Sequence, residues 1–426
     1  MTTSRLALLA DDLTGAADTG AAFAAVGRRT VVLLSPDAPI PPDADVLVMT
    51  SESRALPPDD GDEATRRCAS HISTWIGDDA SARGYVKIDS TLRGHPVMAL
   101  AVVMDGLGVR GALVAPAFPA QGRTTVRGRQ CVNGVPLEAT TFGGEVPTSD
   151  LAVLFGANAP ERVVRLSRDD LQHGTDHVAR LLAAEDRVWI ADVEDDADLA
   201  MLAAAALASP LRVLCGSAGL ARALAHRRSQ GLGGRGWSDD RAGLGEPALP
   251  SRDEGRGPVL VVTGSRHSAT AAQVEALRES GALVVSPDAS YLTSGAADQA
   301  SATAARIVDG LAAGRVTVLA TSGLPAVDIG GAVVAARLAA IVAAVCARVS
   351  VSGLVLTGGD TAAAVCAALG STSLWLTGEL QPGIATATLI GGRHPDLAIV
   401  TKAGGFGDDG ALVDAVTYLA PGAAAD

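Results

Sequence analysis

The sequence predicts an α/β protein of two domains, each built on a mostly parallel sheet flanked by helices. Short apolar runs without alternation recur along the chain, as in LALLA at 6–10, and such runs are typical of strands buried on both faces. Alanine-rich segments with helical composition and spacing, such as 198–208 and 268–280, lie between the runs. The length of 426 residues exceeds what one core usually organises, so two domains are expected.

The predicted strands end in polar or glycine-rich loops, and helical patterns usually follow these loops. In chain order the apolar runs lie at 6–10, 30–34, 45–49, 84–88, 111–115, 187–191 and 211–215, then at 258–262, 282–286, 316–320, 353–357 and 397–401. The segment 229–257 is rich in Gly, Pro, Arg and Asp and has no apolar periodicity, which predicts a linker or surface loop. It divides the chain into a first domain, 1–228, and a second domain, 258–426.

Composition excludes several classes of partner. The formal net charge of −13 disfavours binding to nucleic acid or to an anionic membrane. The most apolar later stretch, 331–350, carries two arginines and is predicted to be a buried helix rather than a membrane span. The five cysteines are odd in number and form no C-x-x-C pair, which favours reduced thiols in the cytoplasm. The sequence leaves the oligomeric state open, with a homo-oligomer as one alternative.

Four strand-end loops of the first half carry dense polar groups, and one of them holds Lys87, one of only two lysines in the chain. Ligands bind outside the carboxyl ends of parallel strands, so these loops predict a site for an anionic, hydroxyl-rich small molecule. Within the first loop, one of Asp11, Asp12 and Thr14 is alternatively the N-cap of the next helix. The candidate substrate-binding residues are Asp11, Asp12, Ser51, Arg54, Lys87, Asp89, Ser90, Arg93 and Arg123.

The strand-end loops of the second half consist mainly of glycine, serine and threonine. Small residues and free backbone N–H groups at a helix start suit a phosphate group, so this half is predicted to bind a nucleotide. The loops lie at 262–270, 320–325, 356–365, 378–392 and 401–410. The candidate nucleotide-binding residues are Ser265, Gly358, Gly359, Asp360, Thr361, Lys402, Gly404 and Gly405.

As a set, the motifs resemble those of the four-carbon acid sugar kinases. The matching stretches are ADDLTGA, SESR, KIDSTLRGHP, APAFPAQGRTT, GSAGLA, TGGDTA, PGIATAT and TKAGGFG, and they span nearly the whole chain in the expected order. The resemblance implies an N-terminal acid-sugar domain, a C-terminal nucleotide domain, and ATP-dependent phosphorylation of threonate, erythronate or 3-oxo-tetronate. It implies acid-sugar contacts at Asp12, Arg54, Lys87, Asp89 and Arg93, and nucleotide contacts at Ser265, at 358–361 and near Gly404.

Phosphoryl transfer requires alignment of a hydroxyl with the γ-phosphate and neutralisation of charge. Asp12 is the first candidate for the catalytic base, with Asp89 sharing the work and Asp360 as the rival base or metal ligand. Arg54 and Arg93 are expected to clamp the substrate carboxylate. Mg²⁺ is expected to bridge the phosphates, although the sequence does not identify its protein ligands. The active site is expected in a cleft between the two domains.

The alternative function is a non-catalytic, two-domain sugar-acid binding protein. The sequence does not determine which four-carbon acid is used or which of its hydroxyls accepts the phosphate.

Overall fold

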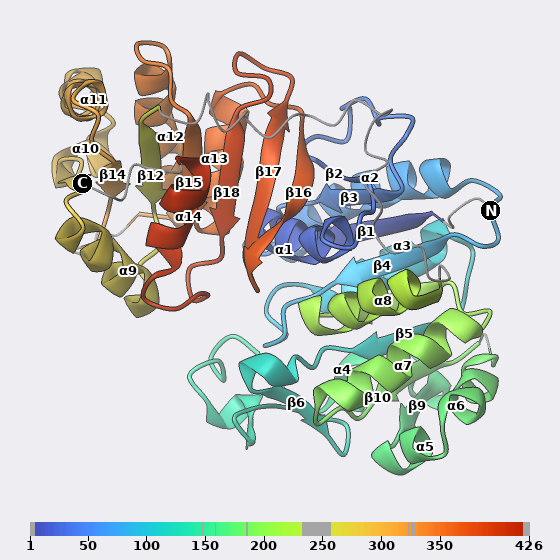
Figure 1. Cartoon of the computed structure of the whole chain (residues 1–426). Helices are drawn as coiled ribbons and strands as arrows, with labels where there is room; N and C mark the ends of the chain where they lie inside the picture. Colours follow the sequence, from blue (N-terminus) through green and yellow to red (C-terminus); the bar gives the residue numbers. More distant parts are fainter. Residues whose placement is uncertain are drawn as a thin grey trace. The chain divides into compact units, whose positions relative to one another are not determined.

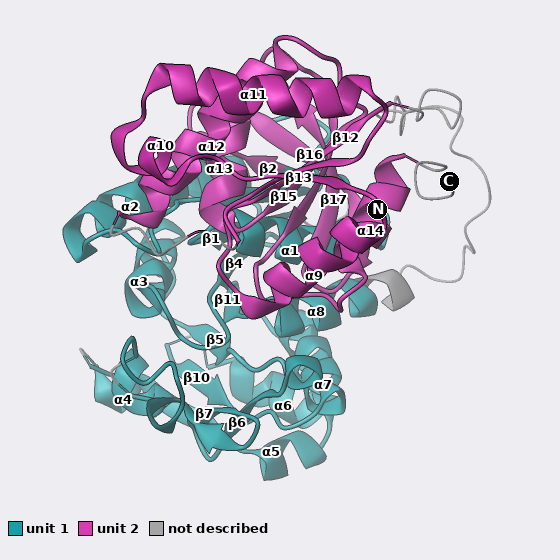
Figure 2. Cartoon of the chain, turned by 90° about the vertical axis from the view of Figure 1, so that its left-hand side faces the viewer, with its two compact units in different colours: residues 1–31, 40–238 teal, residues 32–39, 239–426 magenta. Residues whose placement is uncertain are grey.

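The computed structural model describes residues 5–146, 148–157, 159–184, 186–231, 257–322, 324 and 329–420. These residues form two compact units (Figure 2): the first comprises 5–31 and 40–231, and the second comprises 32–39 and 257–420. Most of the predicted linker lies outside the described residues, and its first three residues continue helix α8 (Ala218–Gly231). Segment 32–39 belongs to the second unit, where Leu34 donates its N–H to the carbonyl of Thr372 at 3.0 Å. The predicted domain boundaries therefore remain predictions.

The first unit is built on a parallel sheet with the strand order β3-β1-β4-β11-β5-β10-β9 (Figure 1). Its central strands are buried along their whole length, which explains their continuous apolar sequences. The strands are β1 (Leu6–Ala10), β3 (Val46–Thr50), β4 (Arg83–Lys87), β5 (Ala112–Ala115), β9 (Val163–Leu166), β10 (Val188–Ala191) and β11 (Val213–Gly216), with β2 (Thr30–Leu33) preceding β3 in the chain.

Helices cover both faces of this sheet. Figure 2 shows α2 and α3 on one side of the strands and α1, α7 and α8 on the other, in agreement with the contacts α2–α3, α1–α8 and α7–α8. The helices are α1 (Leu13–Ala24), α2 (Pro58–Ile76), α3 (Pro96–Gly106), α4 (Leu151–Phe155), α5 (Arg168–Gln172), α6 (Thr175–Leu182), α7 (Asp196–Ala208) and α8.

A small antiparallel sheet in the first unit was not predicted. It consists of β6 (Arg123–Val126), β7 (Arg129–Val132) and β8 (Val135–Pro136). The β6–β7 turn places both Arg127 (φ 51°) and Gly128 (φ 74°) in the left-handed region. Such turns usually carry Asn-Gly or Asp-Gly, so the Arg-Gly pair gave little sign of a hairpin. The hairpin is anchored by the Gly128 N–H, which donates to Asp192 Oδ1 at 2.7 Å.

The second unit has the strand order β13-β14-β12-β15-β18-β17-β16. The strands are β12 (Val259–Thr263), β13 (Leu283–Val285), β14 (Thr317–Ala320), β15 (Gly353–Thr357), β16 (Ser373–Gln381), β17 (Ile384–Ile390) and β18 (Ala398–Lys402). The strands from β13 to β18 in this order pair in parallel, and β17 is antiparallel to both β16 and β18. The segment 378–392, predicted as a phosphate-type turn, therefore lies mainly in the β16–β17 hairpin.

Helices α9 (Ser268–Glu279) and α14 (Ala411–Leu419) form one layer of the second unit, and α10 (Ala289–Ser294), α11 (Ala297–Ala312), α12 (Gly331–Cys346) and α13 (Gly359–Ala368) form the other (Figure 2). The α9–α14 layer packs on the sheet through a core of small aliphatic side chains that includes Val261, Val355 and Val400. The prediction of an α/β fold with mostly parallel strands flanked by helices is confirmed. In the described residues, every cysteine is buried and none forms a disulfide, and no helix combines the length and apolarity that crossing a membrane requires.

Candidate active site

The polar loops of the first unit emerge from one edge of its sheet. In the last row of the strand register, Thr50, Ala10, Lys87, Gly216 and Ala115 lie side by side across β3, β1, β4, β11 and β5. From β1 the chain continues to β3 on one side, whereas from β4 it continues to β5 on the other, so β1 and β4 form the topological switch point. Ligands of open parallel sheets bind at such points.

Arg54 joins the two aspartates that follow β1. Its Nε and Nη2 donate to the two carboxylate oxygens of Asp11 at 2.9 and 2.6 Å, and its Nη1 donates to Asp12 Oδ2 at 2.7 Å. Burial opposes the charged guanidinium, but the carboxylates of Asp12 and Asp11 outweigh it and hold the pKa of Arg54 above its ordinary value. Three of the five N–H groups of Arg54 are thus used within the protein.

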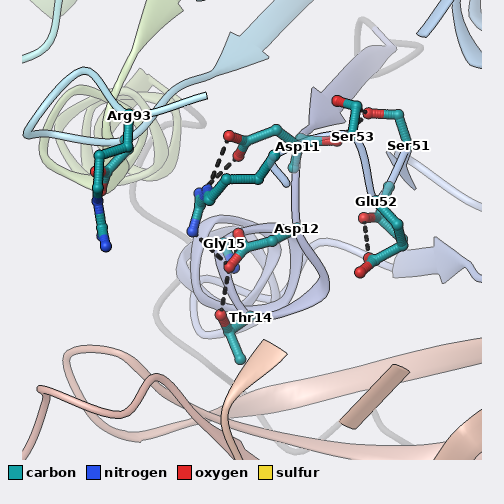
Figure 3. Close-up of polar contacts among 12 residues, drawn as sticks. Asp11, Asp12, Thr14, Gly15, Ser51, Glu52, Ser53 and Arg93 are labelled. Atoms are coloured by element: carbon teal, nitrogen blue, oxygen red, sulfur yellow. Dashed lines mark hydrogen bonds and ion pairs between the residues drawn. The ribbon is translucent and has the colours of Figure 1, made fainter. Parts of the chain in front are cut away.

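Asp12 is the N-cap of α1, which selects one of the three residues proposed for that role. Its Oδ1 accepts a hydrogen bond from the Gly15 N–H at 2.9 Å, and its Oδ2 accepts one from Thr14 Oγ1 at 2.8 Å. Together with the bond from Arg54, these contacts fix the orientation of the carboxylate (Figure 3). Both oxygens of Asp12 therefore already have protein donors.

Asp89 is held by the loop that follows β4. Its Oδ2 accepts hydrogen bonds from Thr91 Oγ1 and, at 2.6 Å, from Arg93 Nε. Burial raises the pKa of the Asp89 carboxyl, but Arg54, Arg93 and Thr91 outweigh that effect and hold the pKa below its ordinary range. Both contacts use the same oxygen, so Asp89 Oδ1 has no protein donor among the described residues.

Arg93 and Arg123 leave guanidinium groups open beside Asp89. Within the described part of the chain, the Nη groups of Arg93 have no hydrogen-bond partner. Arg123 Nη1 donates to the carbonyl of Gln121, whereas Arg123 Nη2 and the buried Nε have no partner there. Burial lowers the pKa of Arg123, and Asp89 and Arg93 act on it electrostatically with opposite signs. Phe142 lies against the Arg93 guanidinium, with the ring centroid 5.7 Å from Cζ.

Lys87 and Ser90 complete the predicted set around Asp89. Lys87 is 8% exposed, and its Nζ lies 2.9 Å from the point where a Cβ on Gly15 would stand, beside the Asp12 carboxylate. Ser90 is braced by the unpredicted hairpin, because its carbonyl accepts a hydrogen bond at 2.8 Å from Gln130, a fully buried residue of β7.

The predicted residue Ser51 is satisfied within the protein. Its hydroxyl lies 3.2 Å from the carbonyl of Ala10 and 2.8 Å from the hydroxyl of Ser53. Figure 3 shows Ser51 and Ser53 turned toward each other, where they support the loop between β3 and Arg54.

Charge does not balance within the first-unit cluster, which we define as Asp11, Asp12, Arg54, Lys87, Asp89, Arg93 and Arg123. Three carboxylates face four cations, so one positive charge is in excess. Exposed Glu145 also acts on Arg93, but water screens such a group. The first-unit cluster is therefore a local cationic site in an acidic protein.

The second unit has an equivalent switch point between β12 and β15. Its last register row contains Ala320, Thr263, Thr357 and Lys402, so the loops after β14, β12, β15 and β18 leave the same edge. Thr263 and Thr357 are fully buried, and within the described residues their hydroxyls have no hydrogen-bond partner.

Close backbone approach explains the small residues at this edge. A Cβ on Gly264 would stand 2.2 Å from Thr361 Oγ1, so only glycine fits there. Gly358 has a φ of 97° and precedes α13, whose first residue is Gly359, and Asp360 is exposed in the first helical turn. Free N–H groups at this helix start suit phosphate. The described residues contain no group of three or more His, Cys, Asp or Glu side chains arranged to hold a metal ion.

Lys402 lies on the buried side of the glycine-containing turn that follows β18. Its fully buried Nζ donates to the carbonyls of Ala403, Gly404 and Phe406 at 3.0, 3.2 and 2.8 Å. All three N–H groups of the ammonium are therefore used, which leaves none for the phosphate contact that the sequence predicted. Burial lowers the pKa of Lys402 to about 8.

Sequence reasoning missed two buried glutamines that support these loops. Gln130 braces the Ser90 loop, and Gln273 of α9 donates to the carbonyls of residues 406–408. Both are fully buried, and Gln273 lies among apolar positions of an amphipathic helix. A glutamine at a core position is unusual, and that was the available signal.

Comparison with known proteins agrees with this division into two units. Residues 6–224 match the model of a sugar-binding N-terminal domain, and residues 260–412 match that of a nucleotide-binding C-terminal domain. The D-threonate kinases of Salmonella typhimurium and Cupriavidus necator are 33% and 37% identical over 97% and 95% of this chain and 98% and 95% of their own. A 3-oxo-tetronate kinase of Methylobacterium radiotolerans is 31% identical, over 94% of this chain and 96% of its own.

A solved structure from Salmonella typhimurium has a TM-score of 0.76 and 19% identity, and the match covers 96% of this chain and 98% of that one, which shows a shared fold. Both domain models match in the expected order, and the relatives match over nearly their whole length. The chain therefore belongs to the four-carbon acid sugar kinase family.

Proposed function

We propose that this protein is an ATP-dependent kinase that phosphorylates a hydroxyl of a four-carbon sugar acid, namely threonate, erythronate or 3-oxo-tetronate. The first unit binds the acid and the second binds ATP. The family membership supports the reaction class, and the chemistry of the first-unit cluster supports an acid substrate.

The excess positive charge of the first-unit cluster carries this proposal. A carboxylate of the substrate would neutralise it, and the open guanidinium groups of Arg93 and Arg123 supply charge-assisted hydrogen bonds. Arg54 is already engaged by Asp11 and Asp12, so we assign it to the support of those two carboxylates rather than to the substrate clamp.

Asp89 is better suited than Asp12 to accept a hydrogen bond from the reacting hydroxyl. Its Oδ1 is open, whereas both oxygens of Asp12 already accept hydrogen bonds. The low pKa of Asp89 makes it a weak base, but phosphoryl transfer depends mainly on positioning and on charge neutralisation. Asp89 would orient the hydroxyl, and Lys87 would offset negative charge near Asp12.

The second unit fits a nucleotide by its chemistry. Its glycines permit close backbone approach at Gly264 and Gly358, and α13 begins directly at the sheet edge. Mg²⁺ would neutralise phosphate charge when bound, and it usually takes one or two carboxylates together with phosphate oxygens and water. Exposed Asp360 is the candidate to hold it.

A substrate panel tests the function directly. The purified chain, ATP and Mg²⁺ are combined with D- and L-threonate, D- and L-erythronate and 3-oxo-tetronates, and ADP release is measured. Threitol and erythritol are the matched controls, because they keep the hydroxyls and lack the carboxylate. Turnover with at least one acid and with neither polyol is expected. Turnover of the polyols alone would refute the acid assignment, and acid binding without ADP release would favour the non-catalytic alternative.

A further inference from the structure

The turn after β18 has most of its carbonyl groups directed inward. Lys402 Nζ binds the carbonyls of Ala403, Gly404 and Phe406. From the other side, Gln273 Nε2 binds the carbonyls of residues 406, 407 and 408 at 3.1, 3.2 and 2.7 Å. Two fully buried side chains therefore engage five of the six carbonyls of residues 403–408, which we call the phosphate turn.

The inward carbonyls determine where the amides point. In a trans peptide the C=O of one residue and the N–H of the next point in opposite directions, and the described chain contains no cis peptide bond. Because the carbonyls of Ala403 and Gly404 point toward the ammonium, the N–H groups of Gly404 and Gly405 point away from it. Among the described residues neither N–H donates a backbone hydrogen bond, whereas Phe406 N–H closes the turn on the Ala403 carbonyl at 3.1 Å.

These outward amides lie against the loop that follows β12. A Cβ on Gly404 would stand 2.2 Å from Ser265 Oγ, and a Cβ on Gly405 would stand 3.1 Å from His267 Nε2. The hydroxyl of Thr270 in α9 donates a hydrogen bond to the Gly404 carbonyl at 2.8 Å. The phosphate turn therefore shares the switch-point edge with Ser265, and Gly404 leaves no side chain between the amide and an approaching ligand.

Lys402 also supplies a charge that has no counter-ion among the residues that the structure describes. Burial is the cause that shifts its pKa, and all of its hydrogen-bond acceptors are neutral carbonyls. A buried cation behind outward N–H groups creates a positive potential at the surface of the turn. An anion bound there would supply the missing negative charge.

We propose that Lys402 and Gln273 are positioning residues that hold the amides of Gly404 and Gly405 outward as the binding site for a phosphate group of the nucleotide. This inference rests on the proposed function and deepens it, because it separates the residues that touch phosphate from the lysine that organises them. The ligand chemistry is a terminal di- or triphosphate, not the nucleoside.

The test measures whether the variants lose phosphate recognition specifically. Isothermal titration at pH 7 gives the Kd of ADP and of adenosine for the full chain and for Lys402→Met and Gln273→Leu. Each substitution removes the donors and retains an apolar side chain of similar size. We expect the Kd of ADP to rise at least tenfold in both variants and the Kd of adenosine to change less than twofold.

A second pair of variants tests the amide itself. Gly405→Pro removes the N–H and is expected to raise the Kd of ADP at least tenfold, whereas Gly405→Ala keeps the N–H and is expected to stay within threefold. Gln130→Leu is the matched control for Gln273→Leu, because it removes the equally buried glutamine of the first unit and is expected to leave ADP binding unchanged.

Provided that the wild-type chain binds ADP, either of two results would overturn the inference. One is wild-type ADP affinity in Lys402→Met and Gln273→Leu, and the other is an equal loss of ADP and adenosine. Should Lys402→Met not fold by circular dichroism, the Gly405 pair decides, and equal ADP affinities in Gly405→Pro and Gly405→Ala would refute the amide site. A wild-type chain that binds neither ADP nor ATP would refute the proposed function itself.

Discussion

Replacing Arg54 by methionine removes the partner of two largely buried carboxylates. The side chains of Asp11 and Asp12 are 11% and 13% exposed, and Arg54 itself is 25% exposed. Breaking a buried ion pair by removing one partner costs about 3–5 kcal/mol. We take about 3 kcal/mol, because a quarter of the arginine still reaches solvent. For a unit of this size, about 2–4 °C per kcal/mol gives a fall in Tm of about 6–12 °C.

The same geometry predicts non-additivity with Asp11→Asn. That substitution alone weakens a bidentate, charge-assisted contact and should cost about 1.5 kcal/mol. Once Arg54 is methionine, an amide at position 11 removes an unpaired charge, so the double variant should cost about 3 kcal/mol rather than about 4.5. The resulting coupling of about 1.5 kcal/mol lies within the range of residues in direct contact.

Differential scanning calorimetry of the wild type, the two single variants and the double variant measures this coupling. Arg66→Met is the control, because Arg66 pairs with Asp62 on the exposed face of α2, with side chains 58% and 35% exposed. It should lower the Tm by less than about 2 °C, since exposed i,i+4 pairs on a helix contribute about 0.3–0.5 kcal/mol. Two results would show that Arg54 does not support the two aspartates: a fall in Tm for Arg54→Met as small as that of the control, or additive free-energy costs of Arg54→Met and Asp11→Asn. Either result would restore the prediction that Arg54 clamps the substrate carboxylate.

Four further outcomes are expected. Arg123→Gln should raise the KM of the sugar acid about 10–100-fold, the loss of a charge-assisted hydrogen bond, and leave the KM of ATP within twofold in steady-state kinetics. Asp89→Asn should lower kcat at least about 100-fold with ADP affinity retained, whereas a larger loss in Asp12→Asn with little effect in Asp89→Asn would restore Asp12 as the base. The Kd of ADP should rise about tenfold between pH 8 and pH 10, because the pKa of Lys402 is about 8 and a neutral amine no longer attracts phosphate; titration in buffers of different ionisation enthalpy would show proton uptake on binding. Gly264→Ala should weaken ADP binding, because its Cβ would stand 2.2 Å from Thr361 Oγ1, and unchanged calorimetric affinity would contradict that steric reasoning.

The sign of the pH effect separates binding from unfolding. Lys402 loses its proton near pH 8 in the folded chain and near its ordinary value of 10.5 when unfolded. Between these values the unfolded chain holds more protons, so this group stabilises the fold as pH rises. Besides Lys402, the titratable groups at the phosphate turn are His267 and Asp408.

Apolar runs located the strands that are buried on both faces, and all twelve predicted runs overlap strands in the structure. Strand β16 is buried only at alternate positions along much of its length, and β17 has threonines at alternate positions although it is almost entirely buried. With a Pro-Gly turn between the two strands, their composition suggested a loop. The short β6–β8 sheet was missed for a related reason, since its stability comes from contacts with distant residues such as Asp192.

The sequence by itself determined the class of fold and the loops that carry the site, because burial on both faces requires continuous apolar strands and because polar residues then gather at strand ends. It also determined the reaction class, through motifs that lie in a fixed order. Only the tertiary structure decided which charges remain open. Arg54 and Lys402 are as cationic as Arg93 and Arg123 in sequence, but carboxylates distant in sequence use donors of Arg54, and the inward carbonyls of the turn after β18 use those of Lys402. Contacts in the folded structure decide which hydrogen-bond donors already have acceptors, and the type of residue in the sequence does not show this.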